Sequence, residues 1–312
     1  MLFFSGARAY SEVVKKSITQ VGGTREVVFY REAQEIARYR IDKVSGEVEA
    51  GTGDIPDGVV HEYYDDGALR YQWRYKDNAL EGVTEEYSRK GHLVYRWHYS
   101  DGKLEGQSRG YYRKGSVKAE LTFERGLLTG SYREYHENGT LIKEGNYKNN
   151  MLEGVLREYY MDGPLMAVWH YKGGVRNGEG AEYYATGRMK RNASYKNDER
   201  QGTCEEYYKS GTLKMVSSYA AGRLDGPVKE YYESGALQGK WNYKDSKREG
   251  AFERYYEGGE IMEEINFIGG KRDGMANEYY EDGMFKAIRV YKNGTLVRED
   301  IFGKEGTIVS GQ

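Results

Sequence analysis

The segment GSYREYHENGTLIKEGNYKNNMLE, residues 130–153, contains the signals that decide the fold. It opens with a glycine, carries tyrosines at residues 132, 135 and 147, and has Asn138-Gly139 near its middle. Asn-Gly is typical of two-residue hairpin turns of type I′, in which both central residues have positive φ. Tyrosine and β-branched residues favour strands, and the glycine density disfavours helix. The segment therefore predicts a β-hairpin with a tight turn at Asn138-Gly139.

This segment is one of ten repeats that follow one another at a step of 24 residues without any insertion. We number each repeat from its first glycine, which is position zero; these glycines are Gly58, Gly82, Gly106, Gly130, Gly154, Gly178, Gly202, Gly226, Gly250 and Gly274. A second glycine occupies position nine throughout, from Gly67 to Gly283. A fixed period of this kind is the signature of a repeat protein, in which each unit packs mainly on its neighbours.

Aromatic residues also keep fixed positions. Position five is tyrosine in all ten repeats, and position six is tyrosine in all except those with Ser88 and His136. Position seventeen is tyrosine or phenylalanine, and the four tryptophans all occupy position fifteen. A further turn is expected between repeats, as at Lys292-Asn293-Gly294. Each repeat is thus predicted as strand, turn, strand and glycine-bearing connection.

Composition excludes several classes of protein. The 312 residues carry 47 Lys and Arg against 49 Asp and Glu, a net charge of −2 that argues against a nucleic-acid binder. No apolar run approaches the roughly 18–20 residues of a membrane-spanning helix. Cys204 is the only cysteine, which excludes internal disulfides and cysteine-rich zinc scaffolds. The 32 tyrosines and a mean hydropathy of −0.87 indicate a thin, tyrosine-rich folded chain.

A turn at positions eight and nine predicts the pairing of the two strands. Position six should pair with eleven, two with fifteen, and zero with seventeen. Because cross-strand partners share a face, one face would carry the residues at positions six, eleven, fifteen and seventeen. The aromatic ring at position seventeen would then lie over the glycine at position zero.

The other face is predicted to carry the tyrosine at position five, paired with position twelve. That partner is often basic, so a cation would lie over the ring, which is worth about 0.5–1 kcal/mol at an exposed site. The pairs expected are Tyr63–Arg70, Tyr111–Lys118, Tyr183–Lys190, Tyr207–Lys214 and Tyr279–Lys286. Position four is glutamate in eight repeats, which we interpret as a solvated row of charges.

The predicted fold is all-β, an elongated single-layer antiparallel β-sheet of ten stacked 24-residue β-hairpin repeats. Three regions are expected: an N-terminal cap at 1–57, the repeats at 58–297 and a C-terminal cap at 298–312. The N-terminal cap should contain a short helix over 11–20, begun by Ser11 and ended by Gly22-Gly23, and then strands over 27–30 and 36–41. Caps are expected because an open strand edge recruits other chains.

The repeat Gly-x-x-x-Glu-Tyr-Tyr-x-x-Gly-x-Leu, followed by x-Tyr-Lys-x-Gly-x-Leu-x-Gly, resembles the bacterial variant of the MORN repeat. Chains of such repeats are often named YwqK-family antitoxins of toxin–antitoxin systems. The resemblance covers residues 58–297. It implies an elongated sheet of stacked hairpins that acts as a scaffold, with links in some members to phospholipids or membrane-associated assemblies.

No pattern of catalytic residues is visible, so no enzyme activity, catalytic residue, metal or cofactor is predicted. The five histidines are His61, His92, His98, His136 and His170, and only His98 and His170 share a position. These two are expected at the surface, three repeats apart, which is too far to share a metal. Cys204 has no histidine in its own or adjacent repeats. Carboxylates at position four of neighbouring repeats would lie about 10 Å apart, which is wider than glycosidases use.

The tyrosine row at position five is the predicted binding surface. Flanking lysines, arginines and glutamates make it an amphipathic strip of the kind that binds protein segments, glycans or lipid headgroups. The row is Tyr63, Tyr87, Tyr111, Tyr135, Tyr159, Tyr183, Tyr207, Tyr231, Tyr255 and Tyr279.

The function predicted is a non-enzymatic scaffold for protein–protein interaction, with an antitoxin role as one narrow version. The alternative is an envelope-surface module that binds lipid headgroups or cell-wall polymer. No nucleic-acid partner is expected. Residues 1–9 have a short apolar start and an Ala-x-Ala ending but no basic residue at the start, so they resemble only the remnant of a secretion signal. A cytoplasmic location is favoured, and export stays open if these residues are such a remnant.

Overall fold

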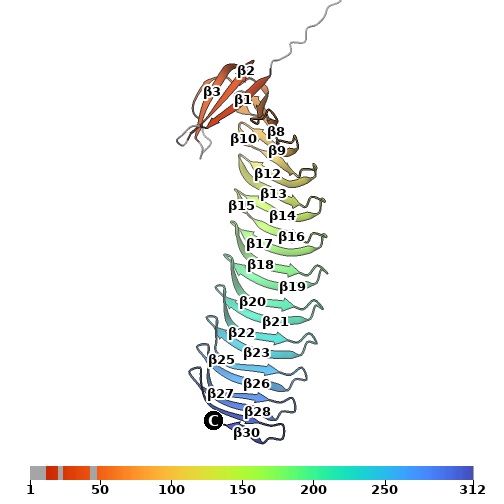
Figure 1. Ribbon diagram of the computed structural model, residues 1–312, viewed down its shortest axis with the longest axis vertical. Coiled ribbons are helices and arrows are strands. Elements are labelled where there is room, and N and C mark those ends of the chain that lie inside the picture. The colour runs from red at the N-terminus through yellow and green to blue at the C-terminus, as the bar shows by residue number, and fades with distance from the viewer. Residues whose placement is uncertain (1–11, 20–23, 43–47, 312) are drawn as a thin grey trace, which may run out of the picture. The chain divides into compact units, whose positions relative to one another are not determined.

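The computed structural model describes residues 12–19, 24–42 and 48–311. Every regular element among these residues is a β-strand, so the predicted all-β class is confirmed (Figure 1). The chain divides into two compact units, Met1–Met151 and Leu152–Gln312, which we call unit 1 and unit 2. In both units successive hairpins pair antiparallel, as the repeat predicts.

Unit 1 begins with four strands outside the repeat and continues with four repeats. The first four strands are β1 (Val13–Thr19), β2 (Thr24–Arg31), β3 (Gln34–Asp42) and β4 (Val48–Gly53). The repeat strands are β5 (Gly58–Tyr63), β6 (Leu69–Lys76), β7 (Ala79–Leu80), β8 (Gly82–Tyr87), β9 (Leu93–Ser100), β10 (Lys103–Leu104), β11 (Gly106–Tyr111), β12 (Val117–Glu124), β13 (Leu127–Tyr135) and β14 (Leu141–Lys148).

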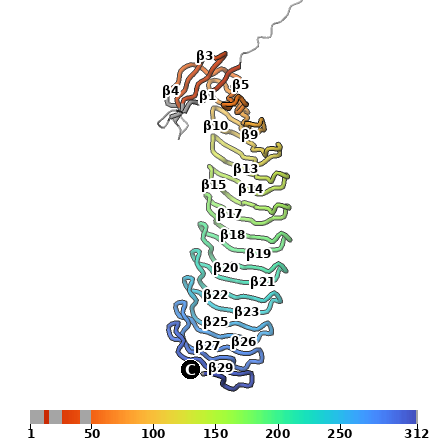
Figure 2. The backbone as a smooth tube through the Cα atoms, viewed as in Figure 1, coloured from red at the N-terminus to blue at the C-terminus, as the bar shows by residue number. Residues whose placement is uncertain are grey.

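Unit 2 holds the remaining six repeats and the strands that follow them. After β15 (Met151–Leu152), where the units divide, its strands are β16 (Gly154–Tyr159), β17 (Leu165–Lys172), β18 (Val175–Tyr183), β19 (Met189–Lys196), β20 (Glu199–Tyr207), β21 (Leu213–Ala220), β22 (Arg223–Tyr231), β23 (Leu237–Lys244), β24 (Lys247–Arg248), β25 (Gly250–Tyr255), β26 (Ile261–Ile268), β27 (Lys271–Tyr279), β28 (Phe285–Lys292), β29 (Thr295–Phe302) and β30 (Ile308–Gly311). Within this unit the strands form one layer. The turns inside repeats lie along one edge of it and the turns between repeats along the other (Figure 2).

The turn inside each repeat differs from the predicted one. The N–H of Gly139 donates to the carbonyl of His136 at 2.9 Å, and the N–H of His136 donates to the carbonyl of Thr140 at 2.8 Å. Gly139 has a φ of 87°, but Asn138 is not among the residues of positive φ. This is a three-residue loop, a type I turn followed by a left-handed glycine. The prediction of a two-residue type I′ turn at Asn138-Gly139 is therefore wrong.

The two-residue turn with two positive φ values instead joins one repeat to the next, at positions nineteen and twenty. In the last repeat Asn293 has a φ of 51° and Gly294 a φ of 87°, so the turn predicted at Lys292-Asn293-Gly294 is confirmed. All ten repeats have positive φ at both positions. Asn, Asp and Gly recur there because they adopt the left-handed conformation at low cost.

The strand register is partly as predicted. Position zero pairs with seventeen and position two with fifteen in every repeat, as in Gly154↔Tyr171 and Leu156↔Trp169. Beyond position four the register shifts, so that position five pairs with eleven. Position twelve is then the extra residue of a β-bulge. The predicted pairings of six with eleven and of five with twelve are therefore wrong.

Two ladders of hydrogen bonds join neighbouring repeats. The hydroxyl of Tyr208, at position six, donates to the carbonyl of Tyr231 at 2.8 Å, and all seven other tyrosines at position six also donate to a carbonyl about one repeat further on. At the opposite edge, the N–H at position twenty donates to the carbonyl at position twenty-two of the preceding repeat, as from Gly222 to Arg200 at 3.0 Å. The sheet is thus fastened along both edges, and the tyrosines at position six have a structural role.

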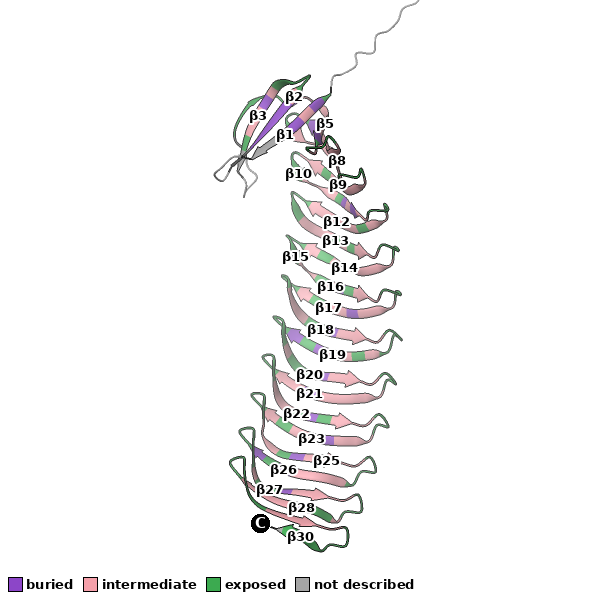
Figure 3. Ribbon diagram, in the orientation of Figure 1, coloured by how far each residue is buried: buried purple, intermediate pink, exposed green. Residues whose placement is uncertain are grey.

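The buried side chains of the repeats gather at position two, which faces positions fifteen and seventeen. Phe252 lies there, packed with Ile265, Phe267 and Ala276 and bordered by Trp241. The equivalent residues Leu156, Cys204 and Val228 are also buried. Elsewhere the strands of unit 2 are mostly half-buried (Figure 3), as expected for a single-layer sheet.

The N-terminal strands correct one prediction. The helix expected over 11–20 is wrong where the structure describes it, because residues 13–19 form strand β1. Val13 and Val14 favour an extended backbone, and β1 pairs along its whole length with β2. It also pairs parallel with β5 through Val13↔Val60 and Val14↔His61, which covers one edge of the first repeat. The strands predicted over 27–30 and 36–41 lie within β2 and β3.

Two expectations about the ends of the chain are not tested by these strands. The region boundaries at 57/58 and 297/298 stay predictions. The secretion-signal remnant predicted at residues 1–9 lies outside the described residues.

Replacing Gly154 by Val is expected to destabilise unit 2 by about 1–3 kcal/mol, the usual cost of a left-handed non-glycine residue. Gly154 has a φ of 81°, and a Cβ added there meets no atom within 4 Å. The glycine is therefore required by its backbone conformation, and an added Cβ would meet no ring atom of Tyr171, its cross-strand partner. Gly154→Asn should cost less than Gly154→Val, because asparagine tolerates this conformation. Equal urea midpoints for the two variants would contradict this explanation.

Candidate functional site

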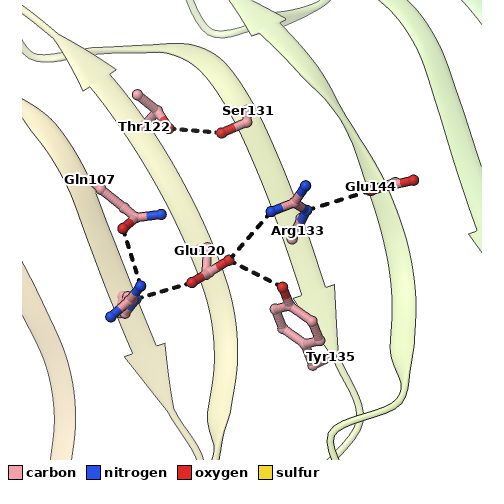
Figure 4. Close-up of polar contacts among 8 residues, drawn as sticks. Gln107, Glu120, Thr122, Ser131, Arg133, Tyr135 and Glu144 are labelled. Atoms are coloured by element: carbon pink, nitrogen blue, oxygen red, sulfur yellow. Dashed lines mark hydrogen bonds and ion pairs between the residues drawn. The ribbon is translucent and has the colours of Figure 1, made fainter.

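The candidate binding surface is the sheet face that carries positions one, three, five, fourteen and sixteen. Opposed charges alternate across it from repeat to repeat. In unit 1 the guanidinium of Arg133 lies 3.5 Å from the carboxylate of Glu144 and 3.9 Å from that of Glu120 (Figure 4). Thr122 and Ser131 are hydrogen-bonded at 3.1 Å on the same face. The surface is therefore a grid of fixed polar contacts.

The predicted tyrosine row lies on this face. Tyr63 is 37% exposed, and the other nine tyrosines at position five are half-buried. Several hydroxyls donate to carboxylates, at 2.5 Å from Tyr87 to Glu85 and at 2.7 Å from Tyr207 to Glu205. Others reach the preceding repeat, as from Tyr135 to Glu120 at 3.1 Å (Figure 4). These bonds hold the rings in place and leave part of each ring accessible.

The carboxylates and tyrosines of this face shift one another's pKa. Burial and the hydrogen bond to Glu85 raise the pKa of Tyr87 to about 12. Burial alone would raise the pKa of Glu85, but the hydrogen bonds from Tyr87 and Arg96 outweigh it and lower that pKa. At neutral pH each pair is thus a neutral phenol donating to an ionised carboxylate.

The basic residues at position twelve do not lie over the tyrosines of the row. Lys118 lies 5.9 Å from the ring of Tyr112, and Lys214 lies 5.7 Å from the ring of Tyr208; both tyrosines occupy position six. Arg70 likewise lies over Tyr64. The bulge at position twelve turns these cations away from position five, so the predicted pairs Tyr63–Arg70, Tyr111–Lys118 and Tyr207–Lys214 are wrong.

The remaining two cations at position twelve bind carboxylates at position four. Lys190 lies 3.5 Å from Glu182, and Lys286 lies 2.5 Å from Glu278. These ion pairs take the place of the predicted contacts of Lys190 with Tyr183 and of Lys286 with Tyr279.

The glutamate row at position four is not the solvated row expected. It pairs with position thirteen and shares the face of the tryptophans. Glu62 is 7% exposed, and its carboxylate accepts the indole N–H of Trp73 at 3.1 Å. In unit 2, Glu158 accepts the N–H of Trp169 at 3.0 Å. These carboxylates satisfy half-buried donors and are structural.

The other chemically distinctive residues form no cluster. Within the described ranges, no group of three or more His, Cys, Asp or Glu could hold a metal ion. Cys204 is 1% exposed, and its burial raises the pKa of the thiol, which disfavours the reactive thiolate. His98 and His170 are exposed, as predicted.

One feature of the site was not predicted from the sequence. An open pocket of about 440 Å³ lies beside Ser88, at one of the two places where position six is not tyrosine. The only signal for it in the sequence is that exception.

The hairpin repeats and their fixed period define a β-repeat protein. Five segments match the family model of the MORN repeat variant, at residues 56–77, 128–149, 200–221, 224–245 and 248–268. Each segment begins two residues before a glycine at position zero, so the match has the same register as the 24-residue period. These five segments of the chain are therefore similar to MORN-variant repeats.

The other comparisons add little. A porin-like protein from Bacteroides uniformis is 10% identical, covers 92% of this chain and 93% of its own, and has a TM-score of 0.14. A functionally unknown protein from Desulfotomaculum acetoxidans is 11% identical, covers 99% of this chain and 86% of its own, and has a TM-score of 0.13. Scores this low carry no argument about fold or function. The search of curated proteins gave no match. No helix among the described residues could cross a membrane.

Proposed function

We propose that this protein is a non-enzymatic repeat module that binds a protein partner through its tyrosine row. The observation that carries the proposal is the row itself, rings at a fixed step, nine of them half-buried, several of whose hydroxyls donate to carboxylates. Tyrosine and arginine dominate binding energy at protein interfaces. Rings that are already ordered lose little conformational entropy on binding.

The charge pattern supports a protein partner. The same face alternates positive and negative groups, as in Arg96–Glu85 at 2.7 Å and Lys240–Glu253 at 2.8 Å. Alternating charges fix the register of a complementary protein surface. An anionic membrane instead favours a surface of one positive sign. A role as an antitoxin is one narrow form of this function, in which the partner is a toxin.

The test is capture from a lysate of the source organism on the immobilised chain, followed by mass spectrometry. Replacing Tyr183, Tyr207 and Tyr231 together by Ala should abolish stoichiometric capture. A matched triple variant of exposed lysines, Lys172→Ala, Lys196→Ala and Lys244→Ala, should leave it unchanged. Circular dichroism must show that both variants keep their sheet structure. Undiminished capture by the folded tyrosine variant would overturn the proposal.

The alternative, an envelope-surface module, predicts a different result. Vesicles containing anionic lipid, or isolated wall polymer, would then retain the chain when no protein does. Binding to the vesicles would fall as salt rises, because salt screens the attraction to the headgroups.

A further inference from the structure

The pocket beside Ser88 is a gap in the tyrosine ladder. In eight repeats a tyrosine at position six donates its hydroxyl to a backbone carbonyl about one repeat further on. The repeat that starts at Gly82 has Ser88 at that position. The hydroxyl oxygen of Ser88 instead accepts the N–H of His92, in its own loop, at 3.2 Å. Position six therefore contributes no ring to the space in front of the next repeat, which His92 also lines.

The residues that line this pocket are suited to bind a tyrosine-like ring. The pocket holds about 440 Å³, within the usual range for small-molecule sites. Leu93 and Val94 supply apolar surface. Tyr111 also lines the pocket and occupies position five, the position whose carbonyl accepts a tyrosine hydroxyl elsewhere in the ladder.

The rim of the pocket is cationic. Arg89, Lys90 and Arg113 line it, and all three side chains are exposed. Among the described residues, Arg89 forms an ion pair with Asp66 at 2.9 Å, and neither Lys90 nor Arg113 forms one. The rim therefore favours a ligand that carries negative charge next to its ring.

We propose that this pocket binds a para-hydroxyphenyl group that carries a nearby carboxylate. The ring would pack on Leu93 and Val94, and its hydroxyl would donate to the carbonyl of Tyr111, as the missing tyrosine would. The carboxylate would face Lys90 and Arg113. Tyr111 belongs to the tyrosine row at position five, but the hydrogen bond proposed here uses only its backbone carbonyl, so either proposal can fail without the other.

The test is calorimetric titration of the full chain with para-hydroxyphenylpropanoate. Wild type should bind it, and Ser88→Ala, which leaves the pocket open, should bind it about equally. Ser88→Tyr should lose binding because its own ring fills the pocket. That variant should also melt at or above the wild-type temperature, since it restores a bond that eight repeats already make.

Two further measurements test the assigned contacts. Phenylpropanoate, which lacks the hydroxyl, should bind about three- to tenfold more weakly, as expected for one lost hydrogen bond. Arg113→Gln should weaken binding of the acid more than binding of uncharged para-cresol. A short acidic peptide with a C-terminal tyrosine separates the two sources of this chemistry: tighter binding of the peptide than of the free acid assigns the site to a protein chain end, and the reverse assigns it to a small molecule.

Three results would overturn the proposal. They are equal binding by wild type and Ser88→Tyr, no binding of para-hydroxyphenylpropanoate or the peptide by wild type, and a lower melting temperature for Ser88→Tyr.

Discussion

Replacing Phe252 by Ala is expected to lower the free energy of unfolding by about 3–5 kcal/mol, the usual cost of removing a large buried aromatic side chain. Phe252 is 6% exposed and occupies position two, the most buried position of the repeat. Its ring centroid lies 5.4 Å from that of Trp241 and 6.0 Å from that of Phe267. The guanidinium of Arg248 lies 4.8 Å from the same ring. The substitution removes all these contacts, and urea denaturation followed by circular dichroism measures the loss.

A nearby exposed residue provides the control. Met275 is 59% exposed, so Met275→Ala should change stability by less than about 0.5 kcal/mol. Because repeats contact mainly their neighbours, the loss from Phe252→Ala should be concentrated around β25 and β26 in hydrogen exchange. If the two substitutions had equal effects, position two would not be the core of the repeat.

The sequence predicts the repeat architecture because its period is exact in spacing and carried by residue types with clear conformational preferences. Gly58 to Gly274 recur without an insertion, and the aromatic residue at position seventeen always faces position zero. The pairs at zero and seventeen and at two and fifteen follow from one assumption, the centre of the turn. These two pairs are the same for either turn type. The bulge at position twelve lies between them and the turn, and it compensates for the extra residue of the loop.

The turn types could not be told from Asn138-Gly139 alone. Both a type I′ turn and a type I turn followed by a left-handed glycine place glycine at the same residue. What separates them is whether Asn138 has positive φ, and asparagine adopts either sign. The extra loop residue shifts the register beyond position four. That shift moves the basic residues of position twelve from Tyr207 to Tyr208, which is why the predicted cation–π pairs failed.

The buried core at position two could not be predicted from the sequence either. Val60, Thr84, Cys204 and Phe252 occupy it in different repeats, so no residue type marks it. The glutamates of position four are uniform and charged, which suggested solvent exposure. Their partners, such as Trp73 for Glu62, become evident only when the cross-strand pairs are known.

The candidate site, too, was predicted only in part. The tyrosine row at position five is evident from the period, but the hydrogen bonds that orient it depend on positions three and fourteen, which vary. Ser88 stood out only as an exception to a rule. The effect of this serine is understood only from the hydrogen bond that tyrosines at position six make to the next repeat. That bond joins residues 23 apart in the sequence, such as Tyr208 and Tyr231.

Raising the pH from 10 to about 12 is expected to destabilise the protein. Tyr63, Tyr71, Tyr87 and Tyr207 have their pKa values raised from 10.0 to about 12, first by burial and then by hydrogen bonds to carboxylates. A raised pKa in the folded state means that the unfolded chain releases its protons first. The stability from these groups is therefore fully present below pH 10 and is lost as the pH rises toward 12. Melting temperatures across this range and the ultraviolet absorbance of tyrosinate measure it.

One substitution separates this mechanism from general charge repulsion at high pH. Glu205→Gln removes the carboxylate that accepts the hydroxyl of Tyr207, so the pKa of Tyr207 should fall toward 10.0 and its ionisation should begin at lower pH. Glu257→Gln removes the same charge from an exposed loop of another repeat and should leave the tyrosine titration unchanged. If both variants shifted the titration equally, net charge and not the local hydrogen bond would control it. A shift with Glu205→Gln alone would mean that the hydrogen bond to the carboxylate of Glu205 contributes to the raised pKa of Tyr207.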